Sequence, residues 1–162
     1  MKYLVLVRHG KPAPPVEDDF GRELIGQGIA QSQSIRDSLI SWLAHNGFSR
    51  ESCSIIWSPA VRAVQTAEII AEGLGLTLEK TDDLYQASAP DILDIASAAA
   101  DTAEVLIIVG HNPTMEKTAS YLIRHMIGMG TGDTVVISLD INGWDGLSSA
   151  SEIKYQHIHP HI

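Results

Sequence analysis

The sequence contains one cysteine, Cys53, in 162 residues, so an internal disulfide bond is excluded. Cys53 precedes the apolar run Ile55-Ile56-Trp57, which favours a small buried hydrophobic side chain over a nucleophile. No apolar run approaches the length that spans a membrane, and the N-terminus lacks the pattern of a signal peptide. These absences predict a cytoplasmic protein with no membrane partner.

Positive charge is also scarce. Lys and Arg number 11 against 20 Asp and Glu, which gives a formal net charge of −9 and disfavours a nucleic-acid partner. The hydrophobic fraction of 44% is typical of a soluble globular protein. No linker, repeat or low-complexity segment divides the chain, so residues 1–162 are predicted to form a single domain.

Three apolar runs end in polar residues. Residues 4–7 lead into Arg8-His9-Gly10, and residues 105–109 repeat this pattern before Gly110-His111-Asn112-Pro113. Residues 55–57 precede Ser58-Pro59, with Arg62 one helical turn beyond. Such runs are typical of strands buried on both faces. Gly10 is interpreted as a position where a ligand approaches the backbone closely.

Helical patterns separate the strands. The predicted helices have apolar faces at Ile35, Leu39, Trp42 and Leu43; at Val64, Ala67, Ala71 and Leu74; at Ile92, Ile95, Ala96 and Ala99; and at Met115, Ala119, Leu122, Ile123 and Met126. Their predicted starts include Ser58 as an N-cap with Pro59 first in its helix, Pro90-Asp91, and Asn112 as a cap before Pro113.

The remaining elements complete the predicted fold. We expect a short strand at residues 76–79, a loop at residues 82–86, a flexible glycine-rich connection at residues 128–133, and final strands at residues 134–141 and 152–158. Because strands alternate with helices, the fold class is α/β: a three-layer sandwich with a mostly parallel central sheet and helices on both faces. The last two strands have no helix between them, so at least one edge strand is antiparallel.

Parallel strands end at the same edge of a sheet, so Arg8, His9 and His111 are expected to meet there, with Arg62 nearby. Helix N-termini at this edge add partial positive charge. Such a pocket in an acidic protein requires an anion. Phosphate is the best match, because arginine binds its oxygens through paired N–H bonds.

These segments resemble a known family. Leu6-Val7-Arg8-His9-Gly10 is similar to the Arg-His-Gly signature of the histidine phosphatase superfamily. Residues 58–67 and Val109-Gly110-His111-Asn112-Pro113 are similar to its second and third motifs. Their order and spacing resemble the compact SixA-like branch of phosphohistidine phosphatases. The resemblance covers about residues 3–125, and its specificity comes from the three motifs together.

The resemblance implies that His9 is the nucleophile of a phosphohistidine intermediate. Arg8 and Arg62 would bind the phosphoryl oxygens and His111 would hydrogen-bond to them, with neither metal nor cofactor. A nucleophilic imidazole must be neutral, and neighbouring guanidinium groups disfavour its protonation.

Two segments depart from the family pattern. Residues 19–25 resemble the segment before the first helix in relatives, but Ile25 replaces a threonine. Asp19 and Arg22 there either border the pocket or form a solvated ion pair, and Asp19 is kept as a substrate-binding residue and a reserve acid. Gln86 stands where some relatives have a glutamate acid, and it is assigned to substrate binding.

The C-terminal His157, His159 and His161 alternate as metal ligands on a strand would. Pro160 interrupts the pattern, and no carboxylate or cysteine lies close in sequence. A frayed, solvated tail is therefore favoured over a metal site.

The leading hypothesis is a phosphatase that acts on phosphohistidine of a partner protein. The alternatives are a small-molecule phosphomonoesterase that uses the same pocket and a non-catalytic phosphate-binding module. An imidazole between two arginines argues against the binding module, because binding alone does not require it.

Overall fold

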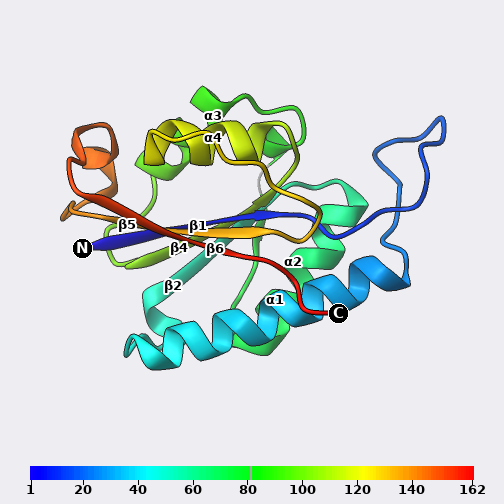
Figure 1. Ribbon diagram of the computed structural model, residues 1–162, viewed down its shortest axis with the longest axis horizontal. Helices are drawn as coiled ribbons and strands as arrows, with labels where there is room; N and C mark the ends of the chain where they lie inside the picture. Colours follow the sequence, from blue (N-terminus) through cyan, green and yellow to red (C-terminus); the bar gives the residue numbers. More distant parts are fainter. Residues whose placement is uncertain (81) are drawn as a thin grey trace.

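The computed structural model describes residues 1–80 and 82–162. Its strands form one six-stranded sheet in the order β3-β2-β4-β1-β5-β6 (Figure 1). The strands are β1 (Lys2–Arg8), β2 (Cys53–Trp57), β3 (Glu79–Lys80), β4 (Val105–Gly110), β5 (Thr134–Leu139) and β6 (Ile153–Ile158). The α-helices are α1 (Gly26–His45), α2 (Val61–Leu74), α3 (Ala89–Ser97) and α4 (Thr114–Ile123), and short 3-10 helices cover Arg50–Ser52, Asp82–Leu84 and Trp144–Ser149.

The sheet confirms the predicted mostly parallel arrangement. β1, β2, β3 and β4 are mutually parallel, and β5 is antiparallel to both β1 and β6. Arg8 pairs with Gly110, and Trp57 pairs with Val109. The carboxyl ends of the three central parallel strands are therefore level, and the residues that follow them lie at one edge.

Side-chain alternation on β1 builds the two layers of the core. Val5 and Val7 pack on the α1 and α2 side, and Leu4 and Leu6 pack on the α3 and α4 side. Figure 1 shows α1 and α2 on one face of the sheet and α3 and α4 on the other. This arrangement confirms the three-layer α/β sandwich. Among the described residues, no helix combines the length and apolar character that crossing a bilayer requires.

The boundaries of two helices, α2 and α4, differ from the sequence prediction. Ser58 is not the N-cap of α2, because the helix begins only at Val61, after an extended Ala60. α4 ends at Ile123, where Arg124 takes a left-handed conformation with φ of 57°. Met126, predicted on the inner face of α4, lies beyond the helix and is 92% exposed. That prediction is wrong because the apolar spacing continues past the point where the backbone leaves the helix.

Other local predictions need smaller changes. The strand predicted at residues 76–79 is displaced to Glu79–Lys80, and the predicted loop after residue 81 contains a 3-10 turn. The start of α3 is predicted correctly, with Pro90 in its first turn. The Ser88 side chain caps this helix by accepting a hydrogen bond from the Asp91 N–H, and the Asp91 carboxylate accepts one from the Ser88 N–H.

Residues 128–133 are not the flexible connection that the sequence predicts. The Gly132 N–H donates to the carbonyl oxygens of Arg8 and His9 at 3.1 and 3.0 Å. The Arg8 N–H donates to the carbonyl oxygen of Asp133, and the Gly130 N–H donates to Oδ2 of Asp133. These bonds attach the segment to the end of β1.

The C-terminal segment is also ordered by contacts, contrary to the frayed tail that the sequence favours. His157 and His159 each place a ring nitrogen 3.0 Å from an oxygen of Asp133. The His161 N–H donates to the hydroxyl of Ser34 on α1. The prediction of a frayed tail is wrong because the Asp133 carboxylate is distant along the chain but close to both histidines in space.

Candidate active site

His9 directly follows β1, and its side chain is buried at 5% exposure. Its Nδ1 lies 2.7 Å from the carbonyl oxygen of Gly10. A carbonyl oxygen only accepts hydrogen bonds, so Nδ1 carries the proton and donates it. The neutral ring therefore leaves the lone pair of Nε2 available, which is the tautomer that a nucleophilic Nε2 requires.

The surroundings of His9 keep the ring neutral. Burial lowers the pKa of His9 to about 3, and nearby His111 and the guanidinium groups of Arg62 and Arg8 act in the same direction. The hydrogen bond to Gly10 opposes this shift but is the weaker effect. At neutral pH the imidazole is therefore unprotonated on one nitrogen.

Gly10 has a different role from the ligand approach expected from the sequence. A Cβ at this position would lie 2.5 Å from the carbonyl oxygen of Gly28 at the start of α1. A Cβ on Gly28 would likewise lie 2.2 Å from the carbonyl oxygen of Lys11. The two glycines let the chain after His9 pack directly on α1. The Gly10 N–H also donates to Oγ1 of Thr66 on α2, which fixes the turn.

The Arg8 side chain is held in place by a hydrogen-bond network of residues on and around α4. Its Nη1 donates to the carbonyl oxygen of Met129 at 2.9 Å. The amide of Asn112 donates to that same oxygen and to Oε2 of Glu116, which in turn accepts the Met129 N–H. Oδ1 of Asn112 also accepts the Glu116 N–H, but α4 begins at Thr114 with Pro113 as its N-cap, one residue later than the sequence predicts.

Arg62 lies on the first turn of α2 and is 6% exposed. Its Nη1 donates to the carbonyl oxygen of Asp19 at 2.7 Å, and its Nη2 pairs with the Asp19 carboxylate at 3.1 Å. The Nε atoms of Arg8 and Arg62 are buried and have no hydrogen-bond partner among the described residues. Both guanidinium groups thus retain a donor, which is the property needed to bind an anion.

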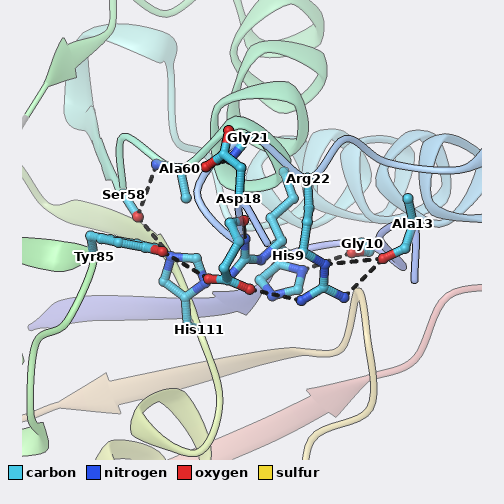
Figure 2. A network of polar contacts seen from close by, with 12 residues as sticks. His9, Gly10, Ala13, Asp18, Gly21, Arg22, Ser58, Ala60, Tyr85 and His111 are labelled. Carbon is cyan, nitrogen blue, oxygen red and sulfur yellow. Dashed lines mark hydrogen bonds and ion pairs between the residues drawn. The ribbon is translucent and has the colours of Figure 1, made fainter. Parts of the chain in front are cut away.

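His111 follows β4, and its ring centroid lies 5.2 Å from that of His9. Its Nε2 is 2.7 Å from Oγ of Ser58, which also accepts the Ala60 N–H (Figure 2). Burial, and then the charge of Arg62, lower the pKa of His111 to about 4. If the Ser58 hydroxyl donates to Nε2, the proton of the neutral His111 ring lies on Nδ1. This atom is buried and has no hydrogen-bond partner among the described residues.

Asp19 borders the site and also forms ion pairs, so both interpretations of this residue hold. Its carboxylate pairs with Arg22 at 2.9 Å and with Arg62, and it accepts the Tyr85 hydroxyl at 2.8 Å. The hydrogen bond from Tyr85, followed by those from the two arginines, holds the pKa of Asp19 well below its usual range. Asp19 is therefore ionised at neutral pH. Figure 2 shows Tyr85, Arg22 and His111 converging in this region.

A cavity of about 710 Å³ joins these residues. Its charged lining consists of Arg8, Lys11, Arg22 and Arg62, with Asp19 as the single carboxylate among the described residues. His9, His111 and Asn112 also line the cavity, and residues 12–15 form part of its wall. The cavity is thus cationic in a protein of net charge −9.

Two other residues considered in the sequence lie elsewhere. Gln86 is exposed and is not part of the cavity lining, and it is the neighbouring Tyr85 that contacts the site. Cys53 begins β2, whereas the cavity lies beyond the carboxyl ends of the parallel strands. Burial raises the pKa of Cys53 to about 11, which opposes a role as a thiolate nucleophile.

The chain matches a known protein family over more than half of its length. The model of the histidine phosphatase superfamily (branch 1) matches residues 4–104. The chain belongs to this superfamily. Membership makes it a phosphatase, a hydrolase of phosphorylated substrates. A comparison with curated proteins found no match to the sequence.

Solved structures resemble this histidine phosphatase over almost its whole length. A proposed phosphohistidine phosphatase SixA from Agrobacterium tumefaciens is 25% identical, with a TM-score of 0.78 and coverage of 99% of both chains. A protein histidine phosphatase SixA complexed with tungstate is 19% identical, with a TM-score of 0.77 and coverage of 98% of this chain and 97% of that chain. A mycobacterial glucosyl-3-phosphoglycerate phosphatase is 14% identical, with a TM-score of 0.68 and coverage of 99% of both chains.

The structure adds residues to the histidine phosphatase site that sequence reasoning did not assign to it. The sequence pattern predicts Ser58 as a helix cap, although its position directly after a buried strand is a usable signal for a site residue. Tyr85 falls within the predicted loop at residues 82–86. Met129 contributes a backbone oxygen, and a side-chain pattern cannot reveal such a contact.

Proposed function

We propose that this protein is a phosphohistidine phosphatase and that its substrate is a phosphorylated histidine on a partner protein. The observation that carries the proposal is the combination of a neutral, buried His9 with the lack of a protonated carboxyl in the described cavity lining. The lining contains a nucleophile and cationic groups, but its single carboxylate, Asp19, is ionised. Such a site suits a substrate whose leaving group needs no proton donor.

In the proposed first step, Nε2 of His9 attacks the phosphorus atom. The bond between phosphorus and the substrate imidazole breaks, and its electron pair goes to that ring. An imidazole already protonated on its other nitrogen leaves as the neutral molecule, so no acid is required. The proton on Nδ1 of His9 stays on the hydrogen bond to Gly10 throughout.

In the second step, a water oxygen attacks the phosphorus atom on His9. The bond from phosphorus to Nε2 breaks, inorganic phosphate leaves with the protons of the water, and His9 returns to its neutral form. Arg8, Arg62 and His111 are proposed to stabilise the charge on the equatorial oxygens in both steps. Their unpartnered buried nitrogens support this assignment. The tungstate complex of a SixA relative supports an oxyanion ligand of this shape.

A small-molecule phosphomonoesterase is the second candidate. The glucosyl-3-phosphoglycerate phosphatase among the similar structures favours it, because that protein is named for a small phosphate ester. Expelling an alkoxide without an acid costs about 10²–10⁴-fold in rate, so the described lining disfavours this candidate.

We further propose that residues 1–162 act as one domain and that the protein is cytoplasmic. The roles of Asp19 and Gln86 in substrate binding stay predictions.

The test compares kcat/KM on a phosphohistidine protein, an aryl phosphate with an acidic phenol, and an unactivated alkyl phosphate. We expect the rates to fall in that order. Asp19→Asn serves as the internal check for a hidden acid. If Asp19 only positions Arg62, all three rates fall by a similar factor.

Three results would overturn the proposal. Equal rates of the wild-type protein on the alkyl phosphate and on phosphohistidine would show that the site contains an acid. A loss of rate in Asp19→Asn that is confined to the substrates with poorer leaving groups would show the same. Unchanged activity in His9→Ala would instead support a non-catalytic binding module.

A further inference from the structure

A second group of histidines lies outside the catalytic cavity lining. Asp133 directly precedes β5, His157 lies on β6, and His159 follows β6. Nε2 of His157 is 3.0 Å from Oδ2 of Asp133, and Nδ1 of His159 is 3.0 Å from Oδ1. The three candidate ligand atoms, one from each residue, lie within 4.8 Å of one another.

We propose that Asp133, His157 and His159 bind a divalent transition-metal ion, with Zn²⁺ the best match. Two imidazole nitrogens beside one carboxylate suit Zn²⁺ better than Mg²⁺ or Ca²⁺, which prefer oxygen ligands only. Zinc binds nitrogen and oxygen at about 2.0–2.2 Å, so neighbouring ligand atoms of a tetrahedral site lie about 3.3–3.5 Å apart. Small side-chain rotations would bring the three residues to that spacing around one ion.

The surroundings of the carboxylate support the site. The Asp133 side chain is only 9% exposed, and the Gly130 N–H donates to its Oδ2 at 2.9 Å, which fixes its orientation. The His159 side chain is 63% exposed, so an ion has a path from solvent. Three protein ligands leave a fourth position for water, as expected for an open zinc site.

The backbone connects this site to the catalytic motif. The Arg8 N–H donates to the carbonyl oxygen of Asp133, and the Gly132 N–H donates to the carbonyl oxygens of Arg8 and His9. Bound metal would therefore brace residues 130–133 against the end of β1 and join the C-terminal segment to them. The ion is not part of the phosphoryl-transfer mechanism, and the inference does not rest on the proposed function.

The test titrates Zn²⁺ alone into metal-free protein without a polyhistidine tag, by calorimetry, with Co²⁺ absorption as a probe of coordination. We expect one Zn²⁺ per chain and a visible Co²⁺ spectrum of a tetrahedral site. His159→Ala removes an exposed ligand, which favours retention of the fold, and should weaken binding at least about tenfold. At a free Zn²⁺ concentration 100 times the Kd, Tm should rise by about 5–10 °C.

His161→Ala is the matched control. It removes a neighbouring C-terminal histidine that is outside the cluster and should bind Zn²⁺ like the wild type. Asp133→Asn provides a second loss-of-ligand variant. Wild-type protein that binds no Zn²⁺, or that binds it no more tightly than His159→Ala, would overturn the proposal. Loss of binding in His161→Ala with normal binding in His159→Ala would overturn it as well.

Discussion

The protein contains two pairs of histidines in opposite electrostatic settings. His9 and His111 are buried beside Arg8 and Arg62, and both have lowered pKa values. His157 and His159 instead contact a carboxylate near the surface. In the first pair, burial and then the cationic neighbours keep the imidazoles neutral, and the arginines supply positive charge for an anion. In the second pair, the carboxylate supplies the negative charge that a cation needs.

The contrast shows that histidine spacing alone does not define the chemistry of a site. His157 and His159 are two residues apart, and His9 and His111 are 102 residues apart, yet each pair meets in space. The charge and burial of the neighbours decide between an anion site and a cation site. Each prediction below changes one of these neighbours or the histidine itself.

The largest expected effect comes from Arg62→Lys. Lysine keeps the positive charge but loses the planar fork that pairs with phosphate oxygens and with Asp19. We expect kcat/KM to fall about 10²-fold, the scale for losing one aligned donor to the transition state. Steady-state kinetics measure this, with the exposed Arg50→Lys as the control. Near-normal turnover in Arg62→Lys would place this arginine outside the mechanism.

The second prediction concerns stability at acidic pH. The pKa values of His9 and His111 are about 3 and 4 in the folded protein, against about 6.5 in an unfolded chain. Below pH 6.5 the unfolded state therefore binds more protons, and the free energy of unfolding falls as pH decreases toward 4. We expect a loss of about 2–4 kcal/mol between pH 7 and pH 5, measured by urea unfolding.

The double variant His9→Asn/His111→Asn tests the origin of this slope. Asparagine does not titrate, so the variant should show a smaller decrease in stability over the same pH range. An unchanged slope in the double variant would assign the pH dependence to other groups.

The third prediction concerns Ser58, which contacts the ring of His111 and not the proposed substrate. Ser58→Ala removes the hydroxyl that orients His111 and selects its tautomer. We expect a decrease of about tenfold in kcat, the scale of a lost neutral hydrogen bond at about 1.4 kcal/mol. Ser58→Thr retains a hydroxyl and should restore part of the rate. Equal losses in both variants would indicate a packing effect.

The smallest effect is expected from His159→Ala. This residue is exposed and lies outside the catalytic cavity lining, so kcat/KM should stay within about twofold of the wild type. Kinetics measured in the presence of a chelator provide the comparison. A large loss under those conditions would show that the two histidine pairs are not independent.

The sequence predicts the architecture and the motif residues well because both depend on local patterns. Continuous apolar runs identify β1 and β4, and their parallel pairing brings Arg8, His9 and His111 to one edge. Arg62 joins them because α2 starts directly beyond β2. Predicting these positions requires only the direction of the strands and the short connections that follow them.

Other contacts depend on the path of distant segments, which local patterns do not contain. Tyr85 reaches Asp19 across 66 positions, and Asp133 meets His157 only because β5 and β6 pair. The prediction of Ser58 as a helix cap is wrong because a serine hydroxyl can either cap a helix or hydrogen-bond to another side chain. Tertiary contact with His111 decided between them.

The central claim is that Nε2 of His9 carries the phosphoryl group during turnover. The most direct measurement is a brief reaction with a phosphohistidine protein carrying labelled phosphate, quenched without acid and mapped by mass spectrometry. The account predicts labelled phosphate on His9 that is lost in acid and retained in alkali, and no label in His9→Ala. Label on Ser58, Asp19 or Cys53, or undiminished labelling of His9→Ala, would contradict it.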